Sequence, residues 1–310
     1  MIITRGFIGI DVSKHELDIF EGGSNRSYRI ANAKDALSSL AVQWKADGAF
    51  VVFEATGRYD ILLRRTLAAA GIAFARVNPA RARDFARAAG FLAKTDRIDA
   101  RMLAAMAQAL SPAPAAEPDG DLEALTLAHK RRDQLVHMRQ QERTRRTECD
   151  DAVLTSDIEA HLRWLDTRIA QWDEEIRSLL ARSQRLSRIA RLLRSIPGIG
   201  PVAATTLIAL MPELGIQQPK QITAMAGLAP FNVDSGQFRG LRRIKGGRKR
   251  VRDALYMAAV AAARSHERFR SMYQRLRIRG KPAKVALIAI ARKLLVTANA
   301  VLRDKTAFQT

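Results

Sequence analysis

Short apolar runs alternate with amphipathic stretches through the first 110 residues of the chain. Each run is bounded by turn residues, which is typical of β-strands, and the longer stretches repeat their apolar residues at helical spacing. The predicted strands are Phe7–Val12, Leu17–Phe20, Ser27–Ile30, Phe50–Glu54 and Ala73–Val77. The predicted helices are Lys34–Ala46, Tyr59–Ala70, Ala80–Ala88 and Arg97–Ala109.

The order of these elements predicts a mixed sheet. Only a few residues separate the first three strands, so we expect them to form an antiparallel meander. The helices that follow are long enough to connect parallel strands. Three antiparallel strands followed by alternating helices and strands is the order of an RNase H-like α/β fold. We therefore expect residues 1–110 to form a domain of that kind.

The next segment has a different pattern. Ser111–Gly120 contains three prolines and a glycine and is expected to be a linker. Residues 121–194 lack glycine and proline, and apolar residues recur at helical spacing on both sides of an expected break near Val153–Asp157. This predicts two long amphipathic helices that form an antiparallel coiled coil or a dimer arm. His129 and His137 are expected at its surface.

Residues 195–310 are expected to form a second, mostly helical domain. It begins with Ser195–Pro201, followed by the apolar segment Val202–Leu210. Good helix-forming residues fill Ala254–Ser265 and Val285–Leu302. The chain is thus predicted to have three parts, residues 1–110, 111–194 and 195–310.

The charge of the chain points to a polyanionic partner. The formal net charge is +21, and residues 236–293 carry 18 Lys or Arg against two Asp or Glu. The partner is expected to be nucleic acid rather than an anionic membrane, because no stretch approaches ~18 uncharged apolar residues. The N-terminus also lacks a signal-peptide pattern. The single cysteine, Cys149, excludes an intramolecular disulfide and fits a reducing compartment.

Four carboxylates stand out against this basic background. Asp11 and Glu54 each close an apolar strand, while Asp96 and Asp99 lie three apart at the start of a helix. Such side chains can converge on one point, and Mg²⁺ prefers oxygen ligands of this kind. The simpler interpretation is that Asp11 and Glu54 are turn residues and the aspartates favour a helix N-terminus. Asp18 is a fifth acid, expected on the strand surface.

Two segments of the C-terminal part are candidate nucleic-acid contacts. Pro197–Gly200 resembles a helix-hairpin-helix turn, in which Gly198 and Gly200 let backbone N–H groups approach a phosphate; a tight turn without a ligand is the alternative. The run Asp234–Arg250 contains four glycines and the basic residues Arg239, Arg242, Arg243, Lys245, Arg248, Lys249 and Arg250. Its Ser235 could act as a nucleophile, although a serine beside a glycine is usually a turn residue.

Several of these motifs together resemble the DEDD transposases of the IS-one-ten insertion-sequence family, which include the Piv-type DNA invertases. The resemblance is collinear over nearly the whole chain. Its N-terminal segments are Gly9–Lys14, Phe53–Tyr59 and Lys94–Ala100. Its C-terminal segments are Ile196–Gly200, Ser235-Gly236, Arg243–Gly247 and Ala254–Met257.

The resemblance implies roles that composition alone does not show. The N-terminal domain would be RuvC-like, with Asp11, Glu54, Asp96 and Asp99 holding Mg²⁺ (or Mn²⁺). Ser235 would be the nucleophile that joins covalently to a DNA phosphate. Family members are thought to act as homodimers that assemble into tetramers, and many use a structured guide RNA that pairs with donor and target DNA.

We therefore expect a site-specific DNA recombinase that excises and inserts a mobile element through a serine–phosphodiester intermediate. It would act in the bacterial cytoplasm, at the nucleoid, without a membrane partner. A Piv-type invertase is the first alternative. A RuvC-like structure-specific endonuclease, in which Ser235 is not catalytic, is the second. A non-enzymatic architectural nucleic-acid protein, with structural acids, is the third.

Overall fold

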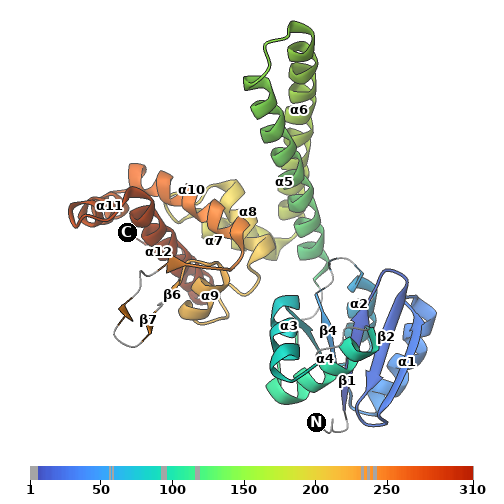
Figure 1. Cartoon of the computed structure of the whole chain (residues 1–310). Helices are drawn as coiled ribbons and strands as arrows, with labels where there is room; N and C mark the ends of the chain where they lie inside the picture. The colour runs from blue at the N-terminus through green and yellow to red at the C-terminus, as the bar shows by residue number, and fades with distance from the viewer. Residues whose placement is uncertain are drawn as a thin grey trace. The chain divides into compact units, whose positions relative to one another are not determined.

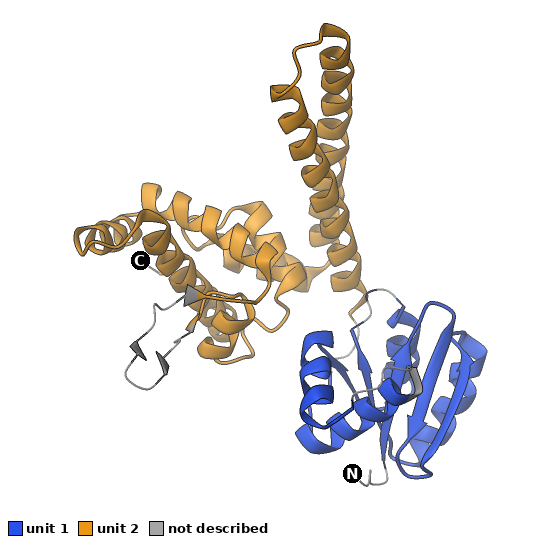
Figure 2. Cartoon of the chain, viewed as in Figure 1, with its two compact units in different colours: residues 1–118 blue, residues 119–310 orange. Residues whose placement is uncertain are grey.

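The computed structural model describes residues 6–55, 57, 59–91, 96–115, 119–231, 234–235, 238–239 and 243–309. The side chains of residues 96–97, 231, 234–235, 238–239 and 243 lie outside this description. The chain divides into two compact units, residues 1–118 and 119–310 (Figure 2). The boundary between the units falls within the predicted linker, and each unit is considered by itself below.

Unit 1 is built on a five-stranded mixed sheet in the order β3-β2-β1-β4-β5 (Figure 1). β1 pairs antiparallel with β2, which pairs antiparallel with β3, whereas β4 is parallel to both β1 and β5. The predicted meander and the parallel strands that follow it are thus confirmed. The strands are β1 (Phe7–Val12), β2 (Glu16–Glu21), β3 (Arg26–Ala31), β4 (Phe50–Glu54) and β5 (Phe74–Val77).

Helices cover both faces of this sheet. Alternation along the strands sends Ile10 and Phe53 to one face, where they belong to a buried cluster with side chains of α1 (Lys34–Ala46) and α2 (Ile61–Ala69). Val52 points to the other face and belongs to a cluster with side chains of α3 (Pro79–Ala88) and α4 (Asp96–Leu110). The second face is therefore the one on which α4 lies.

Unit 2 begins with two long helices, α5 (Gly120–Thr147) and α6 (Ala152–Arg182), that pack along one another as an antiparallel hairpin (Figure 1). Three ion pairs define their register, and consecutive pairs lie seven residues apart on each helix. They are Arg132–Asp173, Arg139–Asp166 and Arg146–Glu159. Leu135, Leu165 and Ile169 form a buried cluster of the same hairpin.

Two expectations for this hairpin are wrong. The break lies at residues 148–151, before the predicted Val153–Asp157, because the Asp151 side chain accepts hydrogen bonds from the backbone N–H groups of Val153 and Leu154. This N-cap starts α6 at Ala152. Val153, where the break was expected, is an exposed apolar residue inside the helix and does not end it. His129, expected at the surface, is 1% exposed.

The remaining helices of unit 2 pack around one large core. Its central element, α12, is long and apolar enough by composition to cross a membrane, but eight of its side chains are buried against other helices. Its apolar character is explained by this packing. The helices are α7 (Gln184–Arg194), α8 (Pro201–Leu210), α9 (Pro219–Met225), α10 (Lys249–Ser265), α11 (Glu267–Ile278) and α12 (Ala283–Asp304).

Short strands lie between α9 and α10. β6 (Pro230–Phe231) pairs with β9 (Arg243–Ile244), and β7 (Asp234–Ser235) pairs with β8 (Phe238–Arg239). The β6–β9 ladder brings the two ends of residues 231–243 together. We call residues 231–243 the serine loop.

Candidate functional site

Asp11 and Glu54 lie at the same edge of the sheet and on the same face. β1 and β4 are parallel and in register up to the pair Ile10–Phe53, so the next residue on each strand is one of the two acids. Val52 belongs to the cluster on the α4 face, and the side-chain alternation of a strand therefore places Glu54 on that face. The same alternation carries Asp11 to the face on which Gly9 meets α4.

Gly9 sets how closely α4 approaches the sheet. A Cβ atom at this position would lie 1.9 Å from the Ala100 carbonyl oxygen and 2.6 Å from the Ala104 backbone nitrogen. Asp99 immediately precedes Ala100, so its backbone lies one residue from this contact. Asp96 opens the same helix, four residues before Ala100, and its side chain is outside the described part. Asp99 thus lies next to the closest contact between α4 and β1, and Asp96 lies about one helical turn before that contact.

Asp18 is a carboxylate that the sequence placed incorrectly. It is 6% exposed rather than on the surface, and it pairs across the ladder with Asp11. Arg29 holds it with its Nε atom, 3.0 and 3.1 Å from the two carboxylate oxygens, and with an Nη atom 2.9 Å away. The Arg29 guanidinium group thus contacts both carboxylate oxygens of Asp18. Asp18 is therefore part of an internal ion pair beside Asp11, not an open fifth ligand.

The segments that follow the two acidic strands are tied down by side chains of unit 1. Asn32 donates to the backbone oxygen of Ser13, after β1, and to that of Tyr59, after β4, at 3.0 Å each. Asp60 is fully buried and accepts from Arg76 at 2.5 Å and from Arg64 at 3.3 Å. Sequence patterns gave little signal for these anchors, because Asn32 and the Asp60–Arg76 pair join segments that are distant in the sequence. Asp60 and Arg64 do have the four-residue spacing of a helical ion pair.

The oxygen-rich donor set suits a hard divalent cation, and the geometry brings three of its members to one region of unit 1. Asp11 and Glu54 share a sheet edge and face, and Asp99 lies on the helix that crosses that face. Among the side chains that the structure describes, no three His, Cys, Asp or Glu residues already form a metal-sized cluster. The side chain of Asp96, the fourth member of the predicted set, is not among those described.

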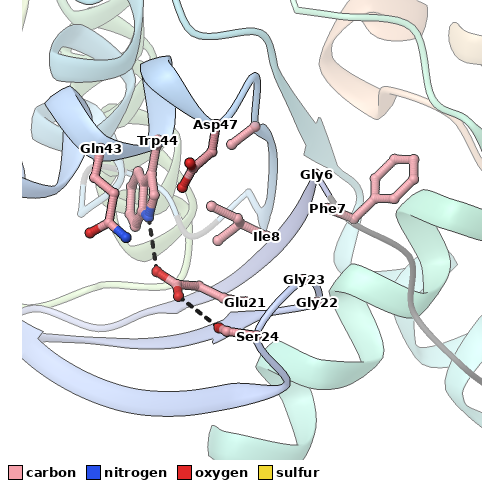
Figure 3. A pocket seen from close by; sticks show the side chains of 11 residues that line it. Gly6, Phe7, Ile8, Glu21, Gly22, Gly23, Ser24, Gln43, Trp44 and Asp47 are labelled. Atoms are coloured by element: carbon pink, nitrogen blue, oxygen red, sulfur yellow. Dashed lines mark hydrogen bonds between the residues drawn. The ribbon is translucent and has the colours of Figure 1, made fainter.

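A pocket of about 340 Å³ lies at the opposite edge of the sheet, where β1 begins and β2 ends (Figure 3). Its Glu21 carboxylate accepts hydrogen bonds from Ser24 and the Trp44 indole. Burial acts to raise the pKa of Glu21, but hydrogen bonds from Tyr28 and Trp44 help bring it below its ordinary value. Glu21 is thus a satisfied structural carboxylate, and this pocket is separate from the acidic edge.

Ser235 lies on β7, directly opposite Phe238 of β8. The base of the serine loop is closely packed. Gly247 has a φ of +70°, and a Cβ atom there would come 2.1 Å from the Gly227 backbone nitrogen. Arg252 donates to the Gly246 backbone oxygen at 2.7 Å. Gly246 and Gly247 thus hold the exit of the loop against the end of α9.

The predicted basic contacts fall into two groups. Arg248 binds both carboxylate oxygens of Glu213 at 2.6 Å, and Arg250 binds both oxygens of Asp133 on α5. These two guanidinium groups therefore serve the fold. Lys249 makes only an exposed pair with Asp253, and Lys245 is exposed. The side chain of Arg242 and those of Arg239 and Arg243 lie outside the described part.

The turn between α7 and α8 contains the two glycines predicted to approach a phosphate. Gly198 has a φ of +85°, and a Cβ atom there would come 2.3 Å from the Ala258 carbonyl oxygen on α10. The need for glycine at position 198 is thus explained by the close packing of this turn against α10. Gly200 has open space around its Cα atom and precedes the first residue of α8. Of the two, Gly200 is the one available to an external group.

Comparison with known proteins extends this picture over both units. Residues 8–153 match a DEDD-type family model described as "Transposase", and residues 190–274 match one described as "Transposase IS116/IS110/IS902 family". The pilin gene-inverting protein of Moraxella bovis is 30% identical over 320 residues, 99% of this chain and 98% of that protein. The Moraxella lacunata protein of the same name is 29% identical over the same shares.

A shorter match comes from an insertion element. The uncharacterized 44.8 kDa protein of IS116 from Streptomyces clavuligerus is 33% identical over 157 residues, 50% of this chain and 38% of that protein. The two family models and the full-length relatives agree with the resemblance that the sequence motifs carry. The chain belongs to the IS116/IS110/IS902 transposase family and is a DNA recombinase by that membership.

Proposed function

We propose that this protein is a site-specific recombinase that excises and inserts a mobile DNA element through a covalent serine intermediate. The observation that carries the proposal is the placement of Asp11 and Glu54 on one face of one sheet edge, beneath the helix that carries Asp99. The order of its strands supports an RNase H-like, RuvC-like identity for unit 1. The full-length likeness to the gene-inverting proteins supports recombination rather than simple cleavage.

Asp11, Glu54, Asp96 and Asp99 would hold Mg²⁺ or Mn²⁺. The bound metal would supply Lewis-acid stabilisation of charge on the scissile phosphate. The protein's own contribution is to fix the ligands. β1 and β4 hold Asp11 and Glu54 side by side, and the close contact at Gly9 holds the helix of Asp96 and Asp99 against β1.

Ser235 would be the nucleophile. Its Oγ loses a proton and forms a bond to the DNA phosphorus while the bond to the leaving deoxyribose oxygen breaks, and that oxygen takes up a proton. The phosphoserine ester keeps the number of phosphodiester bonds constant, so a new strand hydroxyl can reverse the step without an external energy source. The packed base of the serine loop supports this role, because it restricts where residue 235 can lie.

Nucleic-acid backbones would be bound by the basic residues of the serine loop and its exit. The candidates are Arg239, Arg242, Arg243, Lys245 and Lys249, with Gly200 at the start of α8. Arg248 and Arg250 are better understood as internal supports, since each binds a carboxylate with two nitrogens. Gly198 is likewise explained by packing on α10. This division refines which side chains should affect DNA affinity.

Family resemblance adds partners that no residue here identifies by itself. A structured guide RNA would pair with donor and target DNA, and homodimers would assemble into tetramers. The α5–α6 hairpin would be the coiled-coil arm for that assembly, and α7–α8 would be a helix-hairpin-helix element. The protein would act at the bacterial nucleoid in the cytoplasm.

A Piv-type invertase is the second candidate function. It is favoured by the two relatives that match 99% of this chain, which are pilin gene-inverting proteins. Both candidates share the acidic residues and Ser235, and they differ in whether the products are excised or inverted. A RuvC-like endonuclease would instead leave free ends without any protein–DNA bond.

The covalent intermediate can be tested with purified full-length protein. Incubation with labelled DNA carrying the element ends, its guide RNA and Mg²⁺ should give a protein–DNA adduct that survives SDS and disappears in Ser235→Ala. Ser38→Ala, an exposed serine of α1, is the matched control. Peptide mapping should place the phosphate on residue 235. Free nicked ends from both wild type and Ser235→Ala, without an adduct, would establish the endonuclease instead.

A further inference from the structure

A groove in unit 2 has no role in the site described above. It has a volume of about 580 Å³ and lies between α7, α12 and the segment that follows α8. Ile189, Leu192, Leu214 and Leu302 contribute its apolar lining. Its charged lining consists of Arg185, Arg188, Arg191 and Lys305, and none of the described lining residues is acidic. The groove therefore has a strongly positive wall over an apolar floor.

The arginines of α7 are not explained by internal pairing. Arg185 is bound to Asp119, but Arg188 and Arg191 are exposed and have no hydrogen-bond or carboxylate partner in the described part of the chain. Some arginines of the α5–α6 hairpin, such as Arg132 and Arg139, face an aspartate instead. A guanidinium row without internal partners is available to an external anion.

The like charges of these arginines also destabilise α7 itself. Like charges three residues apart destabilise a helix by a few tenths of a kcal/mol per pair. The helix dipole favours cations in the last turn, which accounts for Arg191 and Arg194, but it disfavours them in the first turn. Arg185 is in the first turn and pairs with Asp119, whereas Arg188, in the second turn, has neither a carboxylate partner in the described part of the chain nor a favourable place in the helix dipole. Binding of a polyanion would offset this repulsion.

The spacing of the row fits a phosphodiester backbone. Arg188 and Arg191 are three apart, which corresponds to about 4.5 Å along an α-helix. One nucleic-acid strand places a phosphate about every 3.4 Å along the duplex axis, so the two arginines can face neighbouring phosphates. The lining contains no aromatic side chain on which a base could stack. The concave shape also suits a strand better than a flat membrane.

We propose that the groove between α7 and α12 binds a nucleic-acid phosphodiester backbone, through Arg188 and Arg191, at a site separate from the serine loop. This inference rests on the proposed action on nucleic acid and deepens it. Binding there is independent of base sequence, because the groove offers cations and an apolar floor but no set of groups to read base edges. Lys305 adds charge at the opposite wall.

The test is the salt dependence of binding by the full-length protein in EDTA. One probe is a duplex DNA of about 30 base pairs with arbitrary sequence, and the other is an RNA hairpin of similar size. Each neutralised phosphate contributes about 0.9 to the slope of log affinity against log salt for duplex DNA. Arg188→Gln/Arg191→Gln should therefore flatten the slope by about two units. The charge reversal Arg188→Glu/Arg191→Glu should weaken binding further.

The matched control is Arg143→Gln/Arg163→Gln, which removes the same charge from exposed arginines of the hairpin. Its slope should equal that of wild type. A loss confined to one probe would assign the groove to DNA or to RNA. Equal slopes for the groove variants and the control, or no binding of either probe by wild type, would overturn the proposal. The covalent adduct at Ser235 tests the catalytic proposal separately, because binding in EDTA requires neither a metal ion nor strand cleavage.

Discussion

Gly9 of β1 and Ala100 of α4 are in a contact that no other residue type at position 9 could make. A Cβ atom on Gly9 would lie 1.9 Å from the Ala100 carbonyl oxygen. The glycine sits two residues before Asp11, and Ala100 directly follows Asp99. A single close contact therefore sets the distance between the strand and the helix that carry the proposed metal ligands.

Gly9→Ala should accordingly force α4 away from the sheet. Overpacking of a tightly packed contact typically costs about 1–3 kcal/mol, and here the clash is with backbone atoms that cannot rotate aside. We expect a lower free energy of unfolding, measured by urea denaturation, and loss of recombination. Gly120→Ala is the control, because a Cβ atom there meets nothing within 4 Å. Wild-type stability in Gly9→Ala would show that the contact is not constraining.

The buried carboxylate Asp60 should be a second point of sensitivity. It is held by Arg64 and Arg76 after the strand that ends at Glu54. Asp60→Ala leaves two partly buried guanidinium groups without their partner, and we expect a loss of about 3 kcal/mol in unfolding free energy. Asp47→Ala, which removes an exposed carboxylate of the same unit, should change stability by less than about 0.5 kcal/mol. Equal effects of the two substitutions would contradict a supporting role for Asp60.

The strand order and the positions of these acids could be predicted from the sequence, because buried strands appear as short apolar runs. Asp11 and Glu54 follow from those strand ends. The Asp18–Arg29 pair and the anchors made by Asn32 and Asp60 do not, because they join segments through tertiary contacts. The break between α5 and α6 was predicted at the wrong residues for a related reason. The sequence does not distinguish Asp151 from the neighbouring polar residues, and only the structure shows that its side chain caps α6.

His129 should make the stability of unit 2 depend on pH. Burial lowers its pKa, despite Asp133 at 3.4 Å, and Nε2 has no hydrogen-bond partner in the described part of the chain. In the unfolded chain, His129 has a pKa near 6.5 and binds a proton at pH values where the folded state keeps it neutral. Stability is therefore present above pH 6.5 and falls as the pH drops below it, by at most about 1.4 kcal/mol per pH unit.

Urea denaturation of wild type and His129→Gln at pH 7.5 and 5.5 measures this effect. The wild type should lose more stability on acidification than the variant. His137→Gln, at an exposed position of the same helix, should behave as wild type. The same loss in all three proteins would assign the pH dependence to other groups.

The ion pairs along the hairpin should set its register more than its stability. Arg139 and Asp166 are 2.7 Å apart and partly exposed, and such pairs contribute about 0.2–1 kcal/mol. Asp166→Arg should destabilise the hairpin by a similar amount through repulsion of Arg139. The exchange Arg139→Asp/Asp166→Arg should restore most of it, as measured by a double-mutant cycle in thermal unfolding. Additive effects of the two substitutions would place these side chains apart in solution.

The joint role of the acidic edge and Ser235 is tested most directly in cells that carry the gene with its native flanking DNA. Sequencing would count excised-circle and inverted junctions for wild type, Asp11→Ala, Ser235→Ala and the exposed-residue control Asp150→Ala at matched expression. Junctions should be abundant in wild type and Asp150→Ala and absent from the other two, and their type separates excision from inversion. Junctions that persist in Ser235→Ala would contradict the serine intermediate, and junctions that persist in Asp11→Ala would contradict the metal site.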